Sequence, residues 1–207
     1  MITCNTYYFG DVHRFGITFE LPQDPQMYSG SWLNGSVWYW LSGHCIGNMQ
    51  YVVPLCDVVL QLEYINKKIS FSCNENIFFA DAKQILRVIM NDFENDAEDG
   101  VREKNCFDFA GTFDFWKGFD IRLEMDIMED YIILLLEHEA QARIIIGKID
   151  ENKDYYKFQS EHILNAGEVQ AVFQEAFDWL QLRYQQEMDN ERFHSGQDCS
   201  DTTFENM

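Results

Sequence analysis

A histidine beside a glutamate is the first pattern in this chain that could support catalysis. His138 and Glu139 begin an HExxH-like sequence, in which a zinc protease needs a second histidine four residues after the first. Ala142 occupies that position, so two imidazoles cannot meet on one metal ion. The sequence also contains no GxSxG elbow, no glycine-rich phosphate loop after a strand and no CxxC pair. We therefore interpret His138 and Glu139 as surface residues at the end of a strand.

A cysteine next to a histidine could supply a nucleophile and its base. His44 precedes Cys45, but neighbouring residues of a strand point to opposite faces of the sheet, so these two side chains cannot pair with each other. The sequence leaves open a dyad of Cys45 with the distant His13 or His162. A cysteine without such a partner is typical of core packing.

Two further groups could bind a ligand. Asp120, Glu124 and Asp126 fall on one face of a predicted strand and offer the oxygen ligands that a divalent cation prefers. An aromatic cluster could form a stacking platform, and it consists of Trp32, Trp38, Tyr39 and Trp40. We interpret the carboxylates as a solvated strand face and the aromatic residues as core. We therefore predict no catalytic residue, no metal ion and no cofactor.

The elements that would position these residues are mostly strands. Alternating apolar residues predict a half-buried strand over 13–21, a strand–turn–strand unit over 32–48 and a short strand over 68–73. The same alternation predicts an antiparallel meander, whose strands span 119–127, 130–138 and 141–149. The last two of these are apolar on both faces near their middles, so we expect them to be more deeply buried.

Helical spacing of apolar residues predicts helices over 54–65, 79–91 and 165–186. Together the elements predict an α+β fold: one domain over residues 1–188, with a largely antiparallel β-sheet and about three helices packed mainly on one face. The polar residues 189–207 are predicted to form a flexible tail.

Composition restricts the partners that such a domain can bind. The formal net charge is −20 on 207 residues, with 35 acidic and 15 basic side chains. Hydrophobic residues make up 46% of the chain and aromatic residues 15%, which is enough to form a core, so the excess carboxylates must lie on the surface. An acidic folded surface repels nucleic acid and anionic lipid and attracts basic partners.

The densest run of acid lies in residues 91–100, which contain five carboxylates and no base. We predict a solvated loop there, because a core cannot hold unpaired carboxylates. The carboxylates are those of Asp92, Glu94, Asp96, Glu98 and Asp99. The run is either an ordinary solvated face or an anionic surface that docks a basic protein.

Cysteine usage and the amino terminus indicate the compartment. The six cysteines are Cys4, Cys45, Cys56, Cys73, Cys106 and Cys199. Their wide, irregular spacing is typical of free thiols rather than of a disulfide framework. The first residues lack the charged and apolar segments of a signal peptide, and no run is long enough for a membrane helix. We therefore expect a cytoplasmic protein that uses no membrane.

Several turn and core motifs carry a resemblance to a known family. They are Arg14–Glu20, Trp32–Gly35, Trp40–Gly43 followed by Ile46 and Gly47, Phe113–Phe119, and Ala176–Leu180. Over roughly residues 9–182 the chain resembles immunity protein family 42 of bacterial polymorphic toxin systems. The resemblance implies a small, cytoplasmic, non-enzymatic protein that binds the toxin domain of a contact-dependent or similar system. None of the motifs is catalytic.

The resemblance and the charge together predict a toxin-binding surface. Many such toxin domains are nucleases with basic clefts, which an acidic protein can occupy in place of phosphates. We predict that this surface comprises Asp92, Glu94, Asp96, Glu98 and Asp99, with Glu151 and Asp154 of a second acidic loop over residues 150–157. Two other functions remain as alternatives: a nucleic-acid mimic that inhibits DNA-binding proteins in general, and an enzyme that uses Cys45 or the face formed by Asp120, Glu124 and Asp126.

Overall fold

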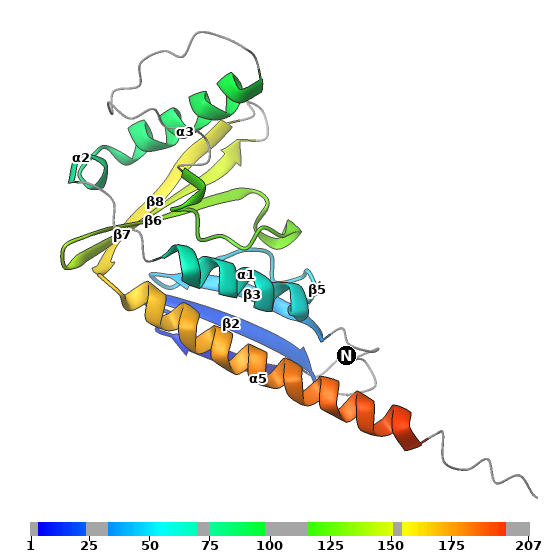
Figure 1. Cartoon of the computed structure of the whole chain (residues 1–207). Coiled ribbons are helices and arrows are strands. Elements are labelled where there is room, and N and C mark those ends of the chain that lie inside the picture. Colours follow the sequence, from blue (N-terminus) through cyan, green and yellow to red (C-terminus); the bar gives the residue numbers. More distant parts are fainter. Residues whose placement is uncertain (1–3, 24–32, 70–74, 98–115, 151–154, 198–207) are drawn as a thin grey trace, which may run out of the picture.

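The computed structural model describes residues 4–23, 33–69, 75–97, 116–150 and 155–197. They form two antiparallel sheets and a set of helices (Figure 1), so the predicted α+β class is confirmed. Within the described residues, no helix is both long and apolar enough to cross a membrane.

The first sheet is built from the amino-terminal part of the chain. Its strands are β1 (Cys4–Gly10), β2 (Phe15–Pro22), β3 (Asn34–Leu41), β4 (His44–Ile46) and β5 (Val53–Pro54). They follow the order β1–β2–β3–β4, and β5 also pairs with β3. Strand β3 is therefore central, which agrees with the bulky residues on both of its faces: Val37, Trp38 and Tyr39 are all buried.

The second sheet is a three-stranded meander. It comprises β6 (Tyr131–His138), β7 (Gln141–Asp150) and β8 (Tyr155–Asn165), in that order. The β6–β7 hairpin turns at Glu139, which has a φ of 52°. The predicted strands over 130–138 and 141–149 are confirmed, whereas β8 begins inside the segment predicted as a second acidic loop.

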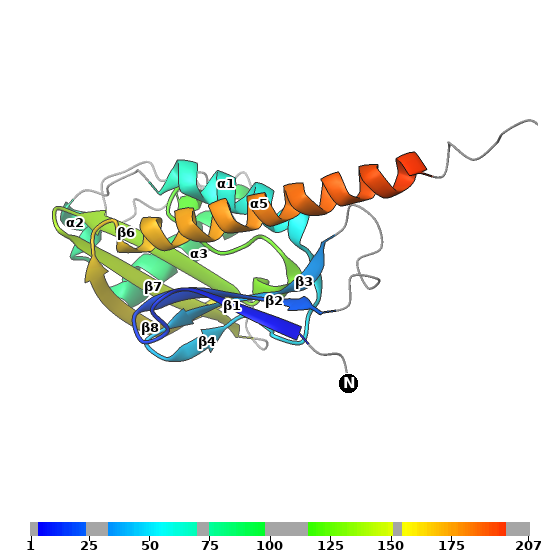
Figure 2. The same cartoon turned by 90° about the horizontal axis from the view of Figure 1, so that it is seen from below.

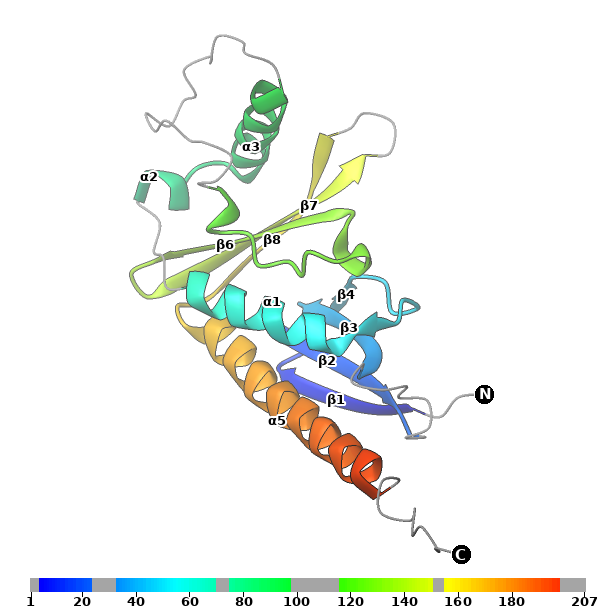
Figure 3. The same cartoon turned by 45° about the vertical axis from the view of Figure 1, so that its right-hand side comes forward.

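Helices cover both sheets. Helices α1 (Leu55–Lys68) and α5 (Glu168–Gln197) run side by side along one face of the first sheet (Figures 2 and 3). Helices α2 (Glu75–Phe78) and α3 (Ala82–Ala97) lie on the far side of the second sheet (Figure 1). The predicted helices over 54–65, 79–91 and 165–186 correspond to α1, α3 and α5, and α2 was not predicted.

The core consists of two apolar clusters separated by the second sheet. Alternate residues of β6, such as Ile133 and Leu135, join the first sheet, α1 and α5 in the larger cluster. The intervening residues, such as Leu134 and Leu136, join α2 and α3 in the smaller cluster. Because both faces of this sheet are covered, β6 is apolar along its whole middle, as predicted.

The predicted strand over 119–127 is wrong. The segment makes an isolated bridge between Asp120 and Leu134, and it then forms a 3-10 helix, η2 (Asp126–Met128). The apolar side chains of Phe119, Ile121 and Leu123 are buried, as a one-sided strand requires. Their backbone, however, contacts β6 only through Ile121 and Phe119, so no continuous ladder forms.

Two other boundaries differ from the prediction. Helix α5 continues to Gln197, so residues 189–197 are helical where a tail was predicted. The helix continues because this stretch contains no proline, and its first glycine is Gly196. The division of the chain at residue 188 stays a prediction. Of the short strand predicted over 68–73, Lys68 ends α1 and residues 70–73 lie outside the described residues.

Candidate functional site

A hollow of about 480 Å³ lies between the start of α1 and the segment that precedes β6. We call it the α1 groove. It is lined by Tyr51, Val52, Val53, Pro54, Asp57, Leu60, Gln61, Glu124, Met125 and Asp126. These residues come from two parts of the chain that are far apart in sequence, so the groove exists only in the folded protein.

The α1 side of the groove follows from how this helix begins. Pro54 precedes the first helical residue and suits that place because its ring fixes φ and it has no N–H to satisfy. The Leu55 N–H donates to the carbonyl of Leu33 at 2.6 Å, which ties the helix start to the first sheet. Since Val58 and Leu62 face the core, the helix must turn its other side outward into the groove.

The opposite wall is held to α1 by one glutamine. The Gln61 side-chain amide donates to the Glu124 carbonyl at 3.1 Å, and the Glu124 N–H donates back to the Gln61 side-chain oxygen at 2.5 Å. This reciprocal pair satisfies the Glu124 backbone in the way that a strand partner would. It explains why the segment around Glu124 lies beside α1 without being a strand.

Exposed apolar side chains line or adjoin the groove. Tyr51, Val52 and Leu60 line it, and Tyr64 lies one helical turn beyond Leu60. Leu60 is 64% exposed, and the other three are also classed as exposed. These residues lie outside the apolar stripe by which α1 was predicted, and sequence reasoning did not identify them. For the two residues on α1, the signal that could have identified them is their spacing: Leu60 and Tyr64 are four residues apart and lie off that stripe.

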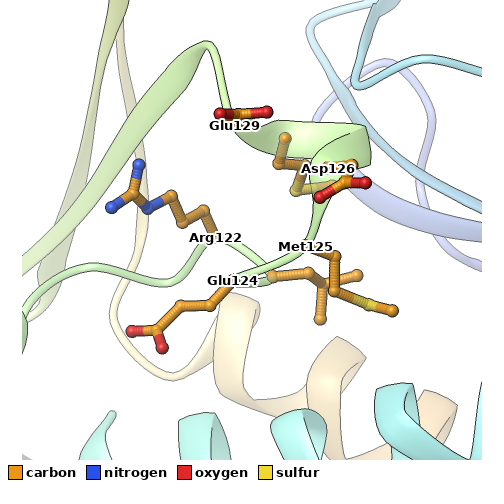
Figure 4. Close-up of a pocket in the computed structure, with 7 residues that line it drawn as sticks. Arg122, Glu124, Met125, Asp126 and Glu129 are labelled. Carbon is orange, nitrogen blue, oxygen red and sulfur yellow. The ribbon is translucent and has the colours of Figure 1, made fainter.

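The rim of the groove is acidic. Asp57, Glu124 and Asp126 line it, and the lining contains no basic residue. A second hollow of about 290 Å³ adjoins it and is lined by Arg122, Leu123, Glu124, Met125, Asp126, Met128 and Glu129 (Figure 4). In the described part of the chain, none of the carboxylates of Asp57, Glu124, Asp126 and Glu129 forms a salt bridge.

Arg122 is the basic residue nearest this rim, and its guanidinium is paired mainly with Asp120, although it also attracts Glu124. Its Nε lies 2.8 Å from the Asp120 carboxylate, and its Nη1 donates to the Tyr131 carbonyl at 2.6 Å. Burial raises the pKa of the Asp120 carboxyl, and the charge of Arg122 opposes that shift. Asp120 is therefore an internal partner of Arg122, apart from the exposed Glu124 and Asp126.

The three carboxylates predicted as a possible cation site therefore do not share one face. Asp120 points into an ion pair, while Glu124 and Asp126 are exposed at the groove. Among the described residues, no group of three or more histidine, cysteine or acidic side chains is arranged to hold a metal ion.

The histidines and Cys45 do not form a nucleophile–base pair in the described part of the chain. Burial raises the pKa of the half-buried Cys45 thiol, which disfavours the reactive thiolate. His162 instead shares a hydrogen bond of 2.7 Å between its Nδ1 and the Ser42 hydroxyl. Its pKa is lowered, first by burial and then by the nearby His44. His138 packs against the Phe78 ring, with 5.7 Å between centroids.

The predicted toxin-binding residues are only partly described. Asp92, Glu94 and Asp96 lie in the carboxy-terminal half of α3, so the predicted loop is wrong for residues 92–97. The helix continues because residues 82–97 contain neither glycine nor proline to stop it. The side chains of these three residues, and all of Glu98, Asp99, Glu151 and Asp154, lie outside the described part of the structure.

Comparisons with known proteins identify a family and a similar fold. The family model for immunity protein 42 matches residues 1–179. No curated protein sequence matches the chain. A solved structure, the crystal structure of CdiI from Burkholderia dolosa AUO158, is similar with a TM-score of 0.57 and 16% sequence identity. The match covers 83% of this chain and 99% of that one, and at this identity it establishes likeness of fold.

Proposed function

The chain belongs to the immunity protein 42 family, and from this premise we propose that it neutralises a cognate toxin domain by tight, stoichiometric binding. The toxin domain is basic, as a nuclease domain is, and belongs to a contact-dependent or related polymorphic toxin system. The immunity protein acts in the cytoplasm, without catalysis, by covering the active site of the toxin or the route of its substrate.

The family match carries this proposal, and the net charge of −20 supports it. Carboxylates placed where a basic cleft expects phosphates attract that cleft and raise the association rate at low salt. The structural likeness to a CdiI protein agrees with a contact-dependent system.

The acidic surface predicted from the sequence remains part of the proposal. It comprises Asp92, Glu94, Asp96, Glu98 and Asp99, with Glu151 and Asp154. Reversal of the five charges between Asp92 and Asp99 should weaken toxin inhibition and reduce its salt dependence. Inhibition that survives this change with the same salt dependence would remove these residues from the contact surface.

Co-purification from a native lysate at low and moderate salt tests the function itself. We expect one basic toxin domain, retained at a 1:1 ratio as salt rises. Capture of several unrelated basic proteins that are lost as salt rises would favour the nucleic-acid mimic, because an immunity protein must discriminate among partners. A turnover activity that Cys45→Ala abolishes would favour an enzyme.

A further inference from the structure

We propose that the cognate toxin docks in the α1 groove and places there a basic segment that carries an aliphatic or aromatic side chain among its lysines or arginines. This inference rests on the proposed function and adds the binding face and the chemistry of the bound segment. It places the contact on a different surface from the sequence prediction, which named the acidic run Asp92–Asp99 with Glu151 and Asp154.

The apolar side chains of the groove are the first support. Exposed apolar residues scattered singly on a surface need no explanation, but a group around one hollow is typical of an interaction site. Tyr51, Val52 and Leu60 line the same hollow. Tyr64 is exposed one turn further along α1, where the Lys68 ammonium lies 3.8 Å from its ring centroid. A tyrosine and a leucine beside a hollow can receive an apolar anchor of a partner, and such anchors supply most of the affinity of an interface.

The charge of the groove selects among the partners that could supply this anchor. Three acids and no base line it. The adjoining hollow adds Glu129 and also Arg122, whose guanidinium lies 2.8 Å from the Asp120 carboxylate. Because the groove carboxylates and Glu129 lack salt-bridge partners within the described residues, a cationic segment would give them one. Nucleic acid, an anionic lipid surface and a second copy of this acidic chain would all be repelled.

The groove is also formed before any partner arrives. The Gln61–Glu124 hydrogen bonds fix its two walls against each other. The Asn48 N–H donates to the Ile127 carbonyl at 3.0 Å, which joins the loop before β5 to η2. The Tyr51 N–H donates to the Asn48 carbonyl at 3.2 Å, which closes a turn at the groove edge. A preformed site loses little conformational entropy on binding and can therefore bind tightly.

Two substitutions in the groove and two matched controls test this inference. Leu60→Gln removes the apolar contact, and Leu182→Gln is its control, since Leu182 is an exposed leucine of α5. Glu124→Lys reverses a rim charge, and Glu175→Lys on the exposed side of α5 makes the same change of net charge elsewhere. All four side chains are exposed, so the variants should fold; circular dichroism and the thermal midpoint check that they do.

Surface plasmon resonance with the toxin domain recovered by co-purification gives the rates. We expect Leu60→Gln to weaken binding about tenfold, mostly through faster dissociation. Glu124→Lys should slow association and flatten its dependence on salt. The two α5 controls should remain within about twofold of the wild type, since substitutions outside an interface change affinity little.

The possible failures are distinguishable. If wild-type protein binds and neutralises the toxin but both groove variants behave like their controls, the groove is not the docking site and the proposed function stands. Loss of binding on reversal of the Asp92–Asp99 charges alone would assign the contact to that acidic run. If the wild type captures no toxin, the proposed function itself fails.

Discussion

Replacement of Arg143 by methionine should destabilise the protein strongly, because this buried arginine fastens α2 to the second sheet. Arg143 lies in β7 and is only 5% exposed. Its Nη1 donates to the carbonyls of Phe78, the last residue of α2, and of Ala80, the latter at 2.7 Å. Its Nε lies 2.8 Å from the Glu161 carboxylate. Methionine keeps much of the apolar stem but removes every one of these hydrogen bonds.

The expected loss follows from what is left without a partner. A buried acceptor without a hydrogen bond costs about 1–3 kcal/mol. The Phe78 carbonyl bond is buried and the Ala80 bond is partly buried, so the first should cost more than the second. The Glu161 side chain is 34% exposed, so water can solvate it once Arg143 is gone. We therefore expect Arg143→Met to lower the free energy of unfolding by roughly 2–4 kcal/mol.

Equilibrium urea denaturation followed by tryptophan fluorescence measures this loss as a lower midpoint with an unchanged slope. Glu161→Gln is the matched control: it weakens the ion pair but leaves both carbonyls bonded, so it should cost about 1 kcal/mol or less. Hydrogen exchange should show faster opening of α2 and α3 in the methionine variant. A loss below about 0.5 kcal/mol, or an equal loss in Glu161→Gln, would refute this role of Arg143.

Three other substitutions give smaller or sharper tests of the fold. Tyr39→Phe should cost about 1–2 kcal/mol in urea denaturation, because the buried Tyr39 hydroxyl donates to the Ile121 carbonyl at 3.0 Å, and a cost near zero would contradict this. Gly35→Ala should lower the thermal midpoint, because a Cβ at this position would lie 2.5 Å from a backbone carbonyl oxygen of β2. An unchanged midpoint would show that β2 and β3 can move apart to accept the methyl group without loss of stability. Hydrogen bonds from Arg14 lower the pKa of Glu168 below its ordinary value of 4.5. This ion pair therefore stabilises the fold fully above pH 4.5, and its contribution is lost as the pH falls through the lowered pKa. Glu168→Gln should therefore reduce stability at pH 7 and reduce it progressively less as the pH falls through that lowered pKa; a loss that does not change with pH would contradict the linkage.

Helices and strands were predicted best where the apolar residues of a segment follow one clear pattern. The continuous apolar run in β6 and β7 and the helical stripe of α5 each bury their residues against two or more neighbours, so local pattern and tertiary packing agree. Strand β1 was missed because most of its side chains are exposed and, among the described strands, it pairs only with β2. Strand β8 was missed because four consecutive polar residues, 159–162, occupy its middle and interrupt any alternation, which its place at the edge of the sheet allows.

The segment over 119–127 shows where periodicity is insufficient. Alternation correctly predicted which side chains are buried, yet the backbone partners were set by tertiary contacts. One side chain, that of Gln61, takes the hydrogen bonds of Glu124 that a strand would have made. No local signal in the sequence links these two residues.

The candidate site was predictable only in its charge. Net charge predicted an acidic docking surface for a basic partner, but it could not say which carboxylates meet apolar side chains. In the α1 groove, Leu60 and Tyr51 meet Glu124 because the chain brings residues 51–61 beside 124–126. That juxtaposition depends on the packing of α1 against the segment before β6, which no single stretch of sequence specifies.

Titration of the cognate toxin's activity with this protein tests neutralisation by stoichiometric binding most directly. At toxin concentrations far above the dissociation constant, we expect residual activity to fall linearly and to reach zero at one immunity protein per toxin. The end point should not change with incubation time. Inactivation by substoichiometric amounts that deepens with time would show turnover, and activity that persists beyond equimolar protein would show that this protein does not neutralise the toxin.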